Sequence, residues 1–249
     1  MTDTPTVPEV WTQPFTVRAT EAGPDERTSV LTIADYFQEA AGEHARSGNV
    51  ETFTLDGGGV GTWVLTRLRL CVQERPAMRE TVTVETWPSG RDRLRAYRDY
   101  RLWRGGVGGE VLATGTSAWL VLHVGRRRPV RLPARVERFG PREPERALSF
   151  GEPPAAPAEI EHDRTFAVRR SDLDRVGHAN NVRFVEWALE ALPSDARLRD
   201  VEVVYRAEAV YGDTVRSEAG PLCEGARLHR LSRSSDDTTL ALARTLWTA

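Results

Sequence analysis

Apolar residues recur with helical spacing in two segments of the chain. The first segment runs from about Thr32 to Ser47, and its apolar face carries Ile33, Tyr36, Phe37, Ala40, Ala41 and His44. The second segment runs from Asn181 to Ala191, and Pro193 follows it. Because proline cannot continue a helix, we expect the second helix to end there.

Alternating apolar and polar residues, the pattern of half-buried strands, accompany both helices. In the first half this pattern covers residues 63–72, 81–87, 94–103 and 111–123. In the second half it covers residues 165–169, 201–209, 214–219, 226–234 and 239–247. Since one helix with an antiparallel meander occurs twice, we predict an α+β fold in which each half is a helix wrapped by a curved antiparallel sheet. The alternative is a single domain behind an unrelated N-terminal module.

A proline-rich stretch separates the two halves. Its prolines, which lie between Phe139 and Ile160, are Pro141, Pro144, Pro153, Pro154 and Pro157. Such a stretch does not join a helix or a sheet easily, so it predicts an extended linker. The 249 residues of the chain suffice for two domains. We therefore expect a first domain over residues 10–139, a linker over 140–160 and a second domain over 161–249.

Composition and charge exclude several classes of protein. The net charge of −2 and the pI near 6.3 argue against a nucleic-acid binder. Cys71 and Cys223 match neither a disulfide framework nor a metal-ligand spacing, so we expect no metal and no cofactor. The segment Met1–Pro14 lacks the apolar core of a signal peptide, and no apolar run is long enough to span a membrane. We expect a cytoplasmic protein.

The most informative segment lies directly before the second helix. Asp174, Gly177, His178, Asn180 and Asn181 crowd into one short loop. Polar groups at such a place can meet the unpaired N–H groups of the first helical turn, and a helix start stabilises negative charge. A carboxylate, an imidazole and a helix start together favour hydrolysis of an acyl bond. In the alternative interpretation, the acid and the asparagines only cap the helix and the histidine is an ordinary surface residue.

The run Asp172-Leu173-Asp174-x-x-Gly177-His178-x-Asn180-Asn181-Val182, which closes on Trp187, resembles the hotdog-fold thioesterases. It is most similar to the acyl-ACP thioesterases, which carry two tandem hotdog domains in one chain. Weaker matches to this family follow in the family's order at residues 38–45, 62–67, 98–100 and 113–119. The resemblance implies hydrolysis of fatty acyl-ACP, with the acyl-chain pocket in the first domain and the catalytic residues in the second.

The resemblance also assigns roles to residues of the loop. Asp174 stands at the position of the family's catalytic aspartate, where a carboxylate would accept a proton from water or orient it. His178 matches the family histidine, which would polarise the thioester carbonyl or position the water. The backbone N–H groups at Ala179 and Asn180 are candidates for binding the oxyanion, and Asn181 is expected to support the helix start.

A second segment, residues 204–209, resembles the family's Tyr-Arg-x-Glu-Cys strand, and on that match Glu208 is a catalytic or water-positioning carboxylate. Without the match, Glu208 would be an ordinary strand glutamate that pairs with an arginine or with solvent. The chain departs from the family at Val176, often asparagine, and at Ala209, often cysteine. Since alanine carries no nucleophile, we expect water to attack the thioester directly.

These departures leave other functions open. The alternatives are an acyl-CoA thioesterase, and a weakly active or non-catalytic double hotdog protein that binds acyl thioesters. A hotdog hydratase or dehydratase is a further alternative, although such enzymes usually place their acid and histidine differently.

Positive charge is densest at Arg126, Arg127, Arg128 and Arg131. Such a cluster is usually a solvated turn. Acyl carrier proteins are acidic as a family, and a local basic cluster could attract one to a chain whose net charge is slightly negative. We therefore expect acyl carrier protein as the partner and this cluster as its docking site, and we expect no nucleic-acid partner. Homodimerisation is left open.

Overall fold

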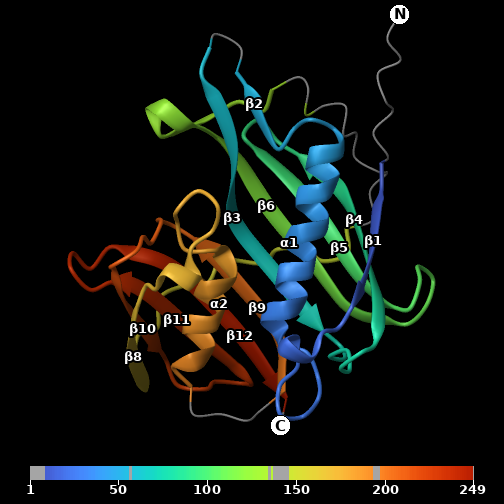
Figure 1. The fold of residues 1–249 in the computed structure, drawn as a ribbon. Coiled ribbons are helices and arrows are strands. Elements are labelled where there is room, and N and C mark those ends of the chain that lie inside the picture. Colours follow the sequence, from blue (N-terminus) through green and yellow to red (C-terminus); the bar gives the residue numbers. More distant parts are fainter. Residues whose placement is uncertain (1–8, 56–57, 134–135, 137–145, 193–196, 249) are drawn as a thin grey trace, which may run out of the picture. The chain divides into compact units, whose positions relative to one another are not determined.

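A computed structural model describes residues 9–55, 58–133, 136, 146–192 and 197–248 of the chain. The chain divides into two compact units, coloured along the sequence in Figure 1. Unit 1 comprises Met1–Thr66 and Gln73–Ser149, and unit 2 comprises Arg67–Val72 and Phe150–Ala249.

Unit 1 is an antiparallel sheet with one long helix. Its elements are β1 (Trp11–Thr16), the 3-10 helix η1 (Ala19–Glu21), α1 (Val30–Ser47), β2 (Thr52–Thr54), β3 (Val60–Val72, up to Thr66 in this unit), β4 (Thr81–Arg91), β5 (Arg95–Arg104), β6 (Val111–His123), the 3-10 helix η2 (Val124–Arg126) and β7 (Arg128–Val130). The strand order is β1-β4-β5-β6-β3, with β2 beside β3 and β7 beside β6.

The helix α1 forms where the sequence provides a cap and an apolar face. The side chain of Ser29 accepts a hydrogen bond from the backbone N–H of Thr32, which satisfies one unpaired donor of the first turn. The buried side chains follow helical spacing and include Ile33, Phe37, Ala40, Ala41 and His44. This face packs against β1 and β4, and Figure 1 shows α1 lying along the strands of unit 1.

Unit 2 repeats this architecture with a shorter helix. Its elements are β8 (His162–Ala167), the 3-10 helix η4 (Arg170–Asp172), α2 (Asn181–Glu190), β9 (Arg197–Tyr205), β10 (Thr214–Ala219), β11 (Ala226–Arg233) and β12 (Thr239–Thr248). The strand order is β8-β10-β11-β12-β9, and Arg67–Cys71 of β3 pair with β9. The helix buries Val182, Val185, Trp187 and Ala188 and packs against β10 and β11. Two units that each combine a helix with an antiparallel sheet confirm the predicted fold class.

The entry into the helix has the same backbone course in both units. In each, a six-residue strand is followed by a three-residue 3-10 helix, a turn and the main helix, with equal spacing throughout. The turn is closed by a bridge between Ala22 and Thr28 in unit 1 and between Leu173 and Ala179 in unit 2. We call this segment the entry turn, residues 22–28 in unit 1 and 173–179 in unit 2.

The observed elements agree closely with the predicted ones. Both helices lie where the periodicity indicates, and β6 and β10 begin and end at the expected residues. The strands β1, β2 and β7 have no counterpart among the predicted elements. Residues 146–160 form no helix or strand, while residues 140–145 of the expected linker lie outside the described residues. Among the described helices, none has the length and apolar character needed to cross a membrane.

Candidate active site

The entry turn of unit 2 places the first candidate carboxylate. The backbone N–H of Asp174 donates to the His178 carbonyl (2.7 Å), and the N–H of Gly177 donates to the Asp174 carbonyl (3.1 Å). Asp174 Oδ1 accepts hydrogen bonds from the N–H groups of Val176 (2.9 Å) and His178 (3.2 Å). Within the described part of the chain Oδ2 accepts none. One carboxylate oxygen thus closes the turn, which leaves the other for a water molecule or a substrate.

The segment that follows β9 places the second carboxylate beside the imidazole. His178 Nε2 lies 3.4 Å from Glu208 Oε2, and the two side chains are 33% and 34% exposed. A bridge between His178 and Val210 joins this segment, residues 206–213, to the entry turn. We call residues 206–213 the glutamate loop. The three side chains predicted from the motif, Asp174, His178 and Glu208, therefore lie in two adjoining loops of unit 2.

The structure gives the expected oxyanion donors other partners. The N–H of Ala179 donates to the carbonyl of Ala209 (2.8 Å), and the N–H of Asn180 donates to the carbonyl of Asp172 (2.8 Å). A backbone N–H has one proton to donate, so neither group can bind an oxyanion without breaking its present hydrogen bond. The prediction is corrected accordingly: the amide of Ala179 connects the entry turn to the glutamate loop, and the amide of Asn180 bonds to the residue directly before the entry turn.

The helix start is capped by Asn180, the residue before the predicted Asn181. The side chain of Asn180 accepts a hydrogen bond from the N–H of Val182 (3.0 Å), whereas Asn181 is the first helical residue. The carbonyl of Asn181 accepts a hydrogen bond from the hydroxyl of Tyr205 at the end of β9 (3.1 Å). Asn181 is thus part of the contact between α2 and β9.

Sequence reasoning missed Asp172, which is 1% exposed and fixes the start of the turn. Its carboxylate accepts hydrogen bonds from the backbone N–H of Arg169 (2.7 Å) and from the guanidinium of the same residue (2.9 and 3.1 Å). Burial acts to raise the pKa of Asp172, but the hydrogen bonds from Arg169 outweigh it and the pKa is lowered. The sequence contains a signal for this role, because Arg18 and Glu21 in unit 1 have the same spacing as Arg169 and Asp172. In the structure the backbone N–H of Arg18 donates to the Glu21 carboxylate, as that of Arg169 does to Asp172.

The entry turn of unit 1 has the same shape but different chemistry. The N–H of Gly23 donates to the carbonyl of Arg27 (2.9 Å), as the corresponding aspartate does in unit 2. In unit 1 a bridge joins Arg27 to Ala77, as a bridge joins His178 to Val210 in unit 2. Arg75 lies two residues before Ala77 and Glu208 lies two residues before Val210, so Arg75 occupies the position of the candidate glutamate. Because glycine and two arginines occupy the three positions, unit 1 offers neither a base nor an imidazole there.

The two departures from the family lie in contrasting environments. Val176 is 60% exposed at the tip of the entry turn, whereas the side chain of Ala209 is fully buried. Cys71 is half-buried in β3 and Cys223 is exposed between β10 and β11, so neither thiol belongs to the two loops. The arrangement therefore provides carboxylates and an imidazole for activating water, and neither of the two loops contains a serine, threonine or cysteine.

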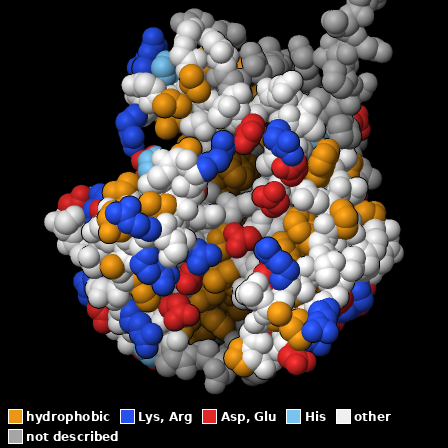
Figure 2. Space-filling view, in the orientation of Figure 1, with side chains coloured by type: hydrophobic (Ala, Val, Ile, Leu, Met, Phe, Trp, Pro, Cys, Tyr) orange, Lys and Arg blue, Asp and Glu red, His pale blue; other side chains and the backbone are white. Residues whose placement is uncertain are grey.

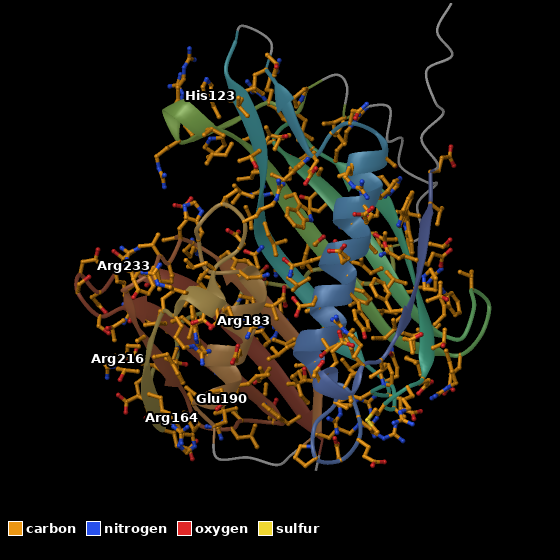
Figure 3. The ribbon with its side chains drawn as sticks, viewed as in Figure 1. His123, Arg164, Arg183, Glu190, Arg216 and Arg233 are labelled. Carbon is orange, nitrogen blue, oxygen red and sulfur yellow. The ribbon has the colours of Figure 1, made fainter. Side chains whose placement is uncertain are left out.

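The arginine cluster of unit 1 lies on the surface, at η2 and β7. Arg126, Arg127, Arg128 and Arg131 are all exposed. Figure 2 shows basic side chains gathered around this turn at the upper left, near a histidine that Figure 3 labels as His123. Within the described residues, no group of three or more histidine, cysteine, aspartate or glutamate side chains is placed to hold a metal ion.

Comparison with known proteins gives one consistent result. The family model described as acyl-ACP thioesterase N-terminal domain matches residues 8–138, and the model of the C-terminal domain of the same enzymes matches residues 155–249. An oleoyl-acyl carrier protein thioesterase of Arabidopsis thaliana is 29% identical over 94% of this chain and 74% of its own length. The chain spans less than two thirds of two further plant relatives, 61% and 63% of their lengths.

Solved structures support the same fold. An acyl-ACP thioesterase from Bacteroides thetaiotaomicron matches with a TM-score of 0.82 and 20% identity, over 96% of this chain and 98% of its own. The 12:0-ACP thioesterase from Umbellularia californica matches with a TM-score of 0.81 and 22% identity, over 97% and 98% of the two chains. These matches confirm the expected pair of hotdog domains.

Proposed function

Because the chain belongs to the acyl-ACP thioesterase family, we propose that it hydrolyses the thioester of fatty acyl-ACP to free fatty acid and acyl carrier protein. The observation that best supports this activity is the convergence of Asp174, His178 and Glu208 in two loops of unit 2, with the imidazole 3.4 Å from the glutamate. Thioester hydrolysis needs a base for water and a polarised carbonyl, and these side chain types provide both.

Water is the nucleophile in the proposed reaction. Asp174 and Glu208 orient it, and one of these carboxylates accepts a proton as the water oxygen attacks the thioester carbon. His178 donates a hydrogen bond to the carbonyl oxygen, since the neighbouring backbone amides already have partners. The tetrahedral intermediate then collapses with cleavage of the carbon–sulfur bond. The proton returns to sulfur, so the products are a carboxylic acid and a free thiol.

The two domains have separate tasks in this proposal. We assign the acyl-chain pocket to the domain over residues 10–139 and the catalytic residues to the domain over 161–249. The names of the relatives include oleoyl, dodecanoyl and palmitoyl enzymes, so family membership does not specify a chain length. The proposed reaction uses no cofactor. We also propose a cytoplasmic location.

We assign carrier docking to Arg126, Arg127, Arg128 and Arg131. Exposed charges act mainly on the association rate and are screened by salt. Replacing the three consecutive arginines with serine is therefore expected to raise KM for acyl-ACP, most clearly at low ionic strength. Turnover of a small acyl thioester, which has no acidic carrier, is the control and should change little. Equal losses on both substrates would indicate damage to the fold, and no loss on either would place docking elsewhere.

A second candidate function, non-catalytic binding of acyl thioesters, is favoured by Val176 and Ala209, where the family often has polar residues. Panels of acyl-ACP and acyl-CoA with several chain lengths separate the candidates when free thiol and free acid are both measured. Release of both products from acyl-ACP supports the proposed enzyme, and preferential release from acyl-CoA supports the alternative carrier. Saturable binding of acyl-ACP without product would contradict the hydrolase.

A further inference from the structure

An arginine outside the proposed reaction holds the glutamate loop in place. Arg233 is the last residue of β11 and is labelled in Figure 3. Its guanidinium donates to the backbone carbonyl of Glu208 through Nη2 (2.8 Å) and to Asp213 Oδ2 through Nε (3.1 Å). Its third nitrogen, Nη1, donates to Asp236 Oδ2 (3.1 Å). The side chain is 23% exposed, so all three donor nitrogens are used in a partly buried setting.

Asp213 connects this arginine to the glutamate loop and to the segment between β8 and the entry turn. Its Oδ2 also accepts the N–H of Val210 (3.0 Å), which lies in the glutamate loop. Its backbone carbonyl accepts the N–H of Val168 (2.9 Å), the residue that follows β8 on the way to the entry turn. Loss of the arginine would therefore remove two of the bonds that fix the glutamate loop, those to Glu208 and to Asp213.

An ion pair in unit 1 corresponds to the pair of Arg233 with Asp213 and indicates which contacts of Arg233 are common to both units. Arg104 pairs with Glu80 there, as Arg233 pairs with Asp213, and both arginines end corresponding strands. Within the described residues, the side chain of Arg104 contacts carboxylates only, those of Glu74, Glu80 and Glu110. The ion pair is thus common to both units. In unit 1, however, the carbonyl of Arg75, which corresponds to that of Glu208, accepts its side-chain hydrogen bond from Arg27 (2.7 Å) and not from Arg104.

We propose that Arg233 is a positioning residue: by holding the carbonyl of Glu208, it keeps the glutamate side chain beside His178. This inference rests on the proposed function for its kinetic consequence, because the rate depends on Glu208 only if Glu208 takes part in hydrolysis. A misplacement of about 1 Å by a distant mutation can lower a rate on the order of 10²-fold. The effect of Arg233 on the structure of the two loops can be measured whether or not the protein hydrolyses a thioester.

The kinetic arm compares Arg233→Met with Arg104→Met, its counterpart in unit 1, using dodecanoyl-ACP as substrate. We expect Arg233→Met to lower kcat by roughly 10- to 100-fold with KM within about twofold, because the loss is one of geometry and not of substrate binding. Arg233→Lys should restore little, since an ammonium group cannot reproduce the fork of a guanidinium. Arg104→Met should lower the melting temperature but keep kcat within about twofold.

The second arm needs no activity and measures hydrogen exchange at the amide of Ala179, which bonds the carbonyl of Ala209 in the glutamate loop. We expect faster exchange in Arg233→Met than in the wild type, and wild-type exchange in Arg104→Met. A folded Arg233→Met protein with wild-type kcat and wild-type exchange would overturn the proposal, as would an equal loss of kcat in Arg104→Met. If the wild type hydrolyses no thioester, the proposed function fails, and unchanged exchange in Arg233→Met would still overturn positioning.

Discussion

Replacing Asp174 by asparagine separates the two tasks of this side chain. Oδ1 closes the entry turn by accepting two backbone hydrogen bonds, and the amide oxygen of asparagine can accept the same bonds. The variant therefore keeps the turn but lacks the carboxylate base. We expect Asp174→Asn to lower kcat by roughly 10²- to 10⁴-fold. That range corresponds to about 3 to 5 kcal/mol of transition-state stabilisation.

Asp174→Ala provides the comparison for stability. It removes the oxygen that accepts both backbone hydrogen bonds, and each bond contributes about 0.5–1.5 kcal/mol net, so the unfolding free energy of Asp174→Ala should fall by about 1–3 kcal/mol. For a chain of this size each kcal/mol lowers the melting temperature by about 2–4 °C. The assays are release of free thiol from acyl-ACP and thermal unfolding of the same samples. Wild-type turnover by folded Asp174→Asn would remove Asp174 from the mechanism. If Asp174→Asn melted at a temperature as low as that of Asp174→Ala, the proposed role of Oδ1 in closing the turn would be refuted.

The two cysteines, the buried His229 and Gly59 each allow a further test. Alkylation of Cys71 and Cys223 should leave activity nearly intact, because neither thiol lies in the two loops; stoichiometric inactivation of folded protein would contradict this. Burial lowers the pKa of His229 to about 4, below the unfolded value, so its contribution of ~3 kcal/mol is present above about pH 6.5 and lost as the pH falls toward 4. Urea unfolding at several pH values should therefore show a flatter acid limb for His229→Gln, and an unchanged limb would refute this assignment. Gly59→Ala should destabilise unit 1 by about 1–3 kcal/mol, because φ is +93° and the new Cβ would lie 2.5 Å from His123 Nε2. A double-mutant cycle with His123→Ala should recover part of that loss, and strict additivity would exclude the clash.

Periodicity predicted the helices and most strands because each buries one face in its own unit. Ile33 and Phe37 lie four residues apart on the buried face of α1, and this spacing can be read without any partner. The strand β1 was missed although alternate side chains are half-buried, since Pro14 interrupts a short segment with few apolar residues. The strands β2 and β7 have three residues each, which is too short for an alternation to be recognised.

The candidate site was predictable only where its residues are neighbours in sequence. Asp174 and His178 lie four residues apart, so the motif contains their relation. Glu208 was identified through family resemblance, because its contact with the imidazole depends on pairing between separate loops. The same dependence explains the error at Ala179: its amide is occupied by a carbonyl of the glutamate loop, and nothing in the local sequence indicates that acceptor.

The entry turn of unit 1 has a consequence for protein engineering. There the N–H of Arg27 is accepted by Asp25 Oδ1 (3.2 Å), so an acid from a different position fulfils the need of the turn. Gly23 does not have a left-handed conformation, and the nearest atom to a Cβ built on it is Asp25 Oδ1 at 3.4 Å. A carboxylate can therefore be introduced at residue 23 without redesigning the backbone. With an imidazole at residue 27 and a carboxylate at residue 75, the chain would contain a second scaffold for the same constellation.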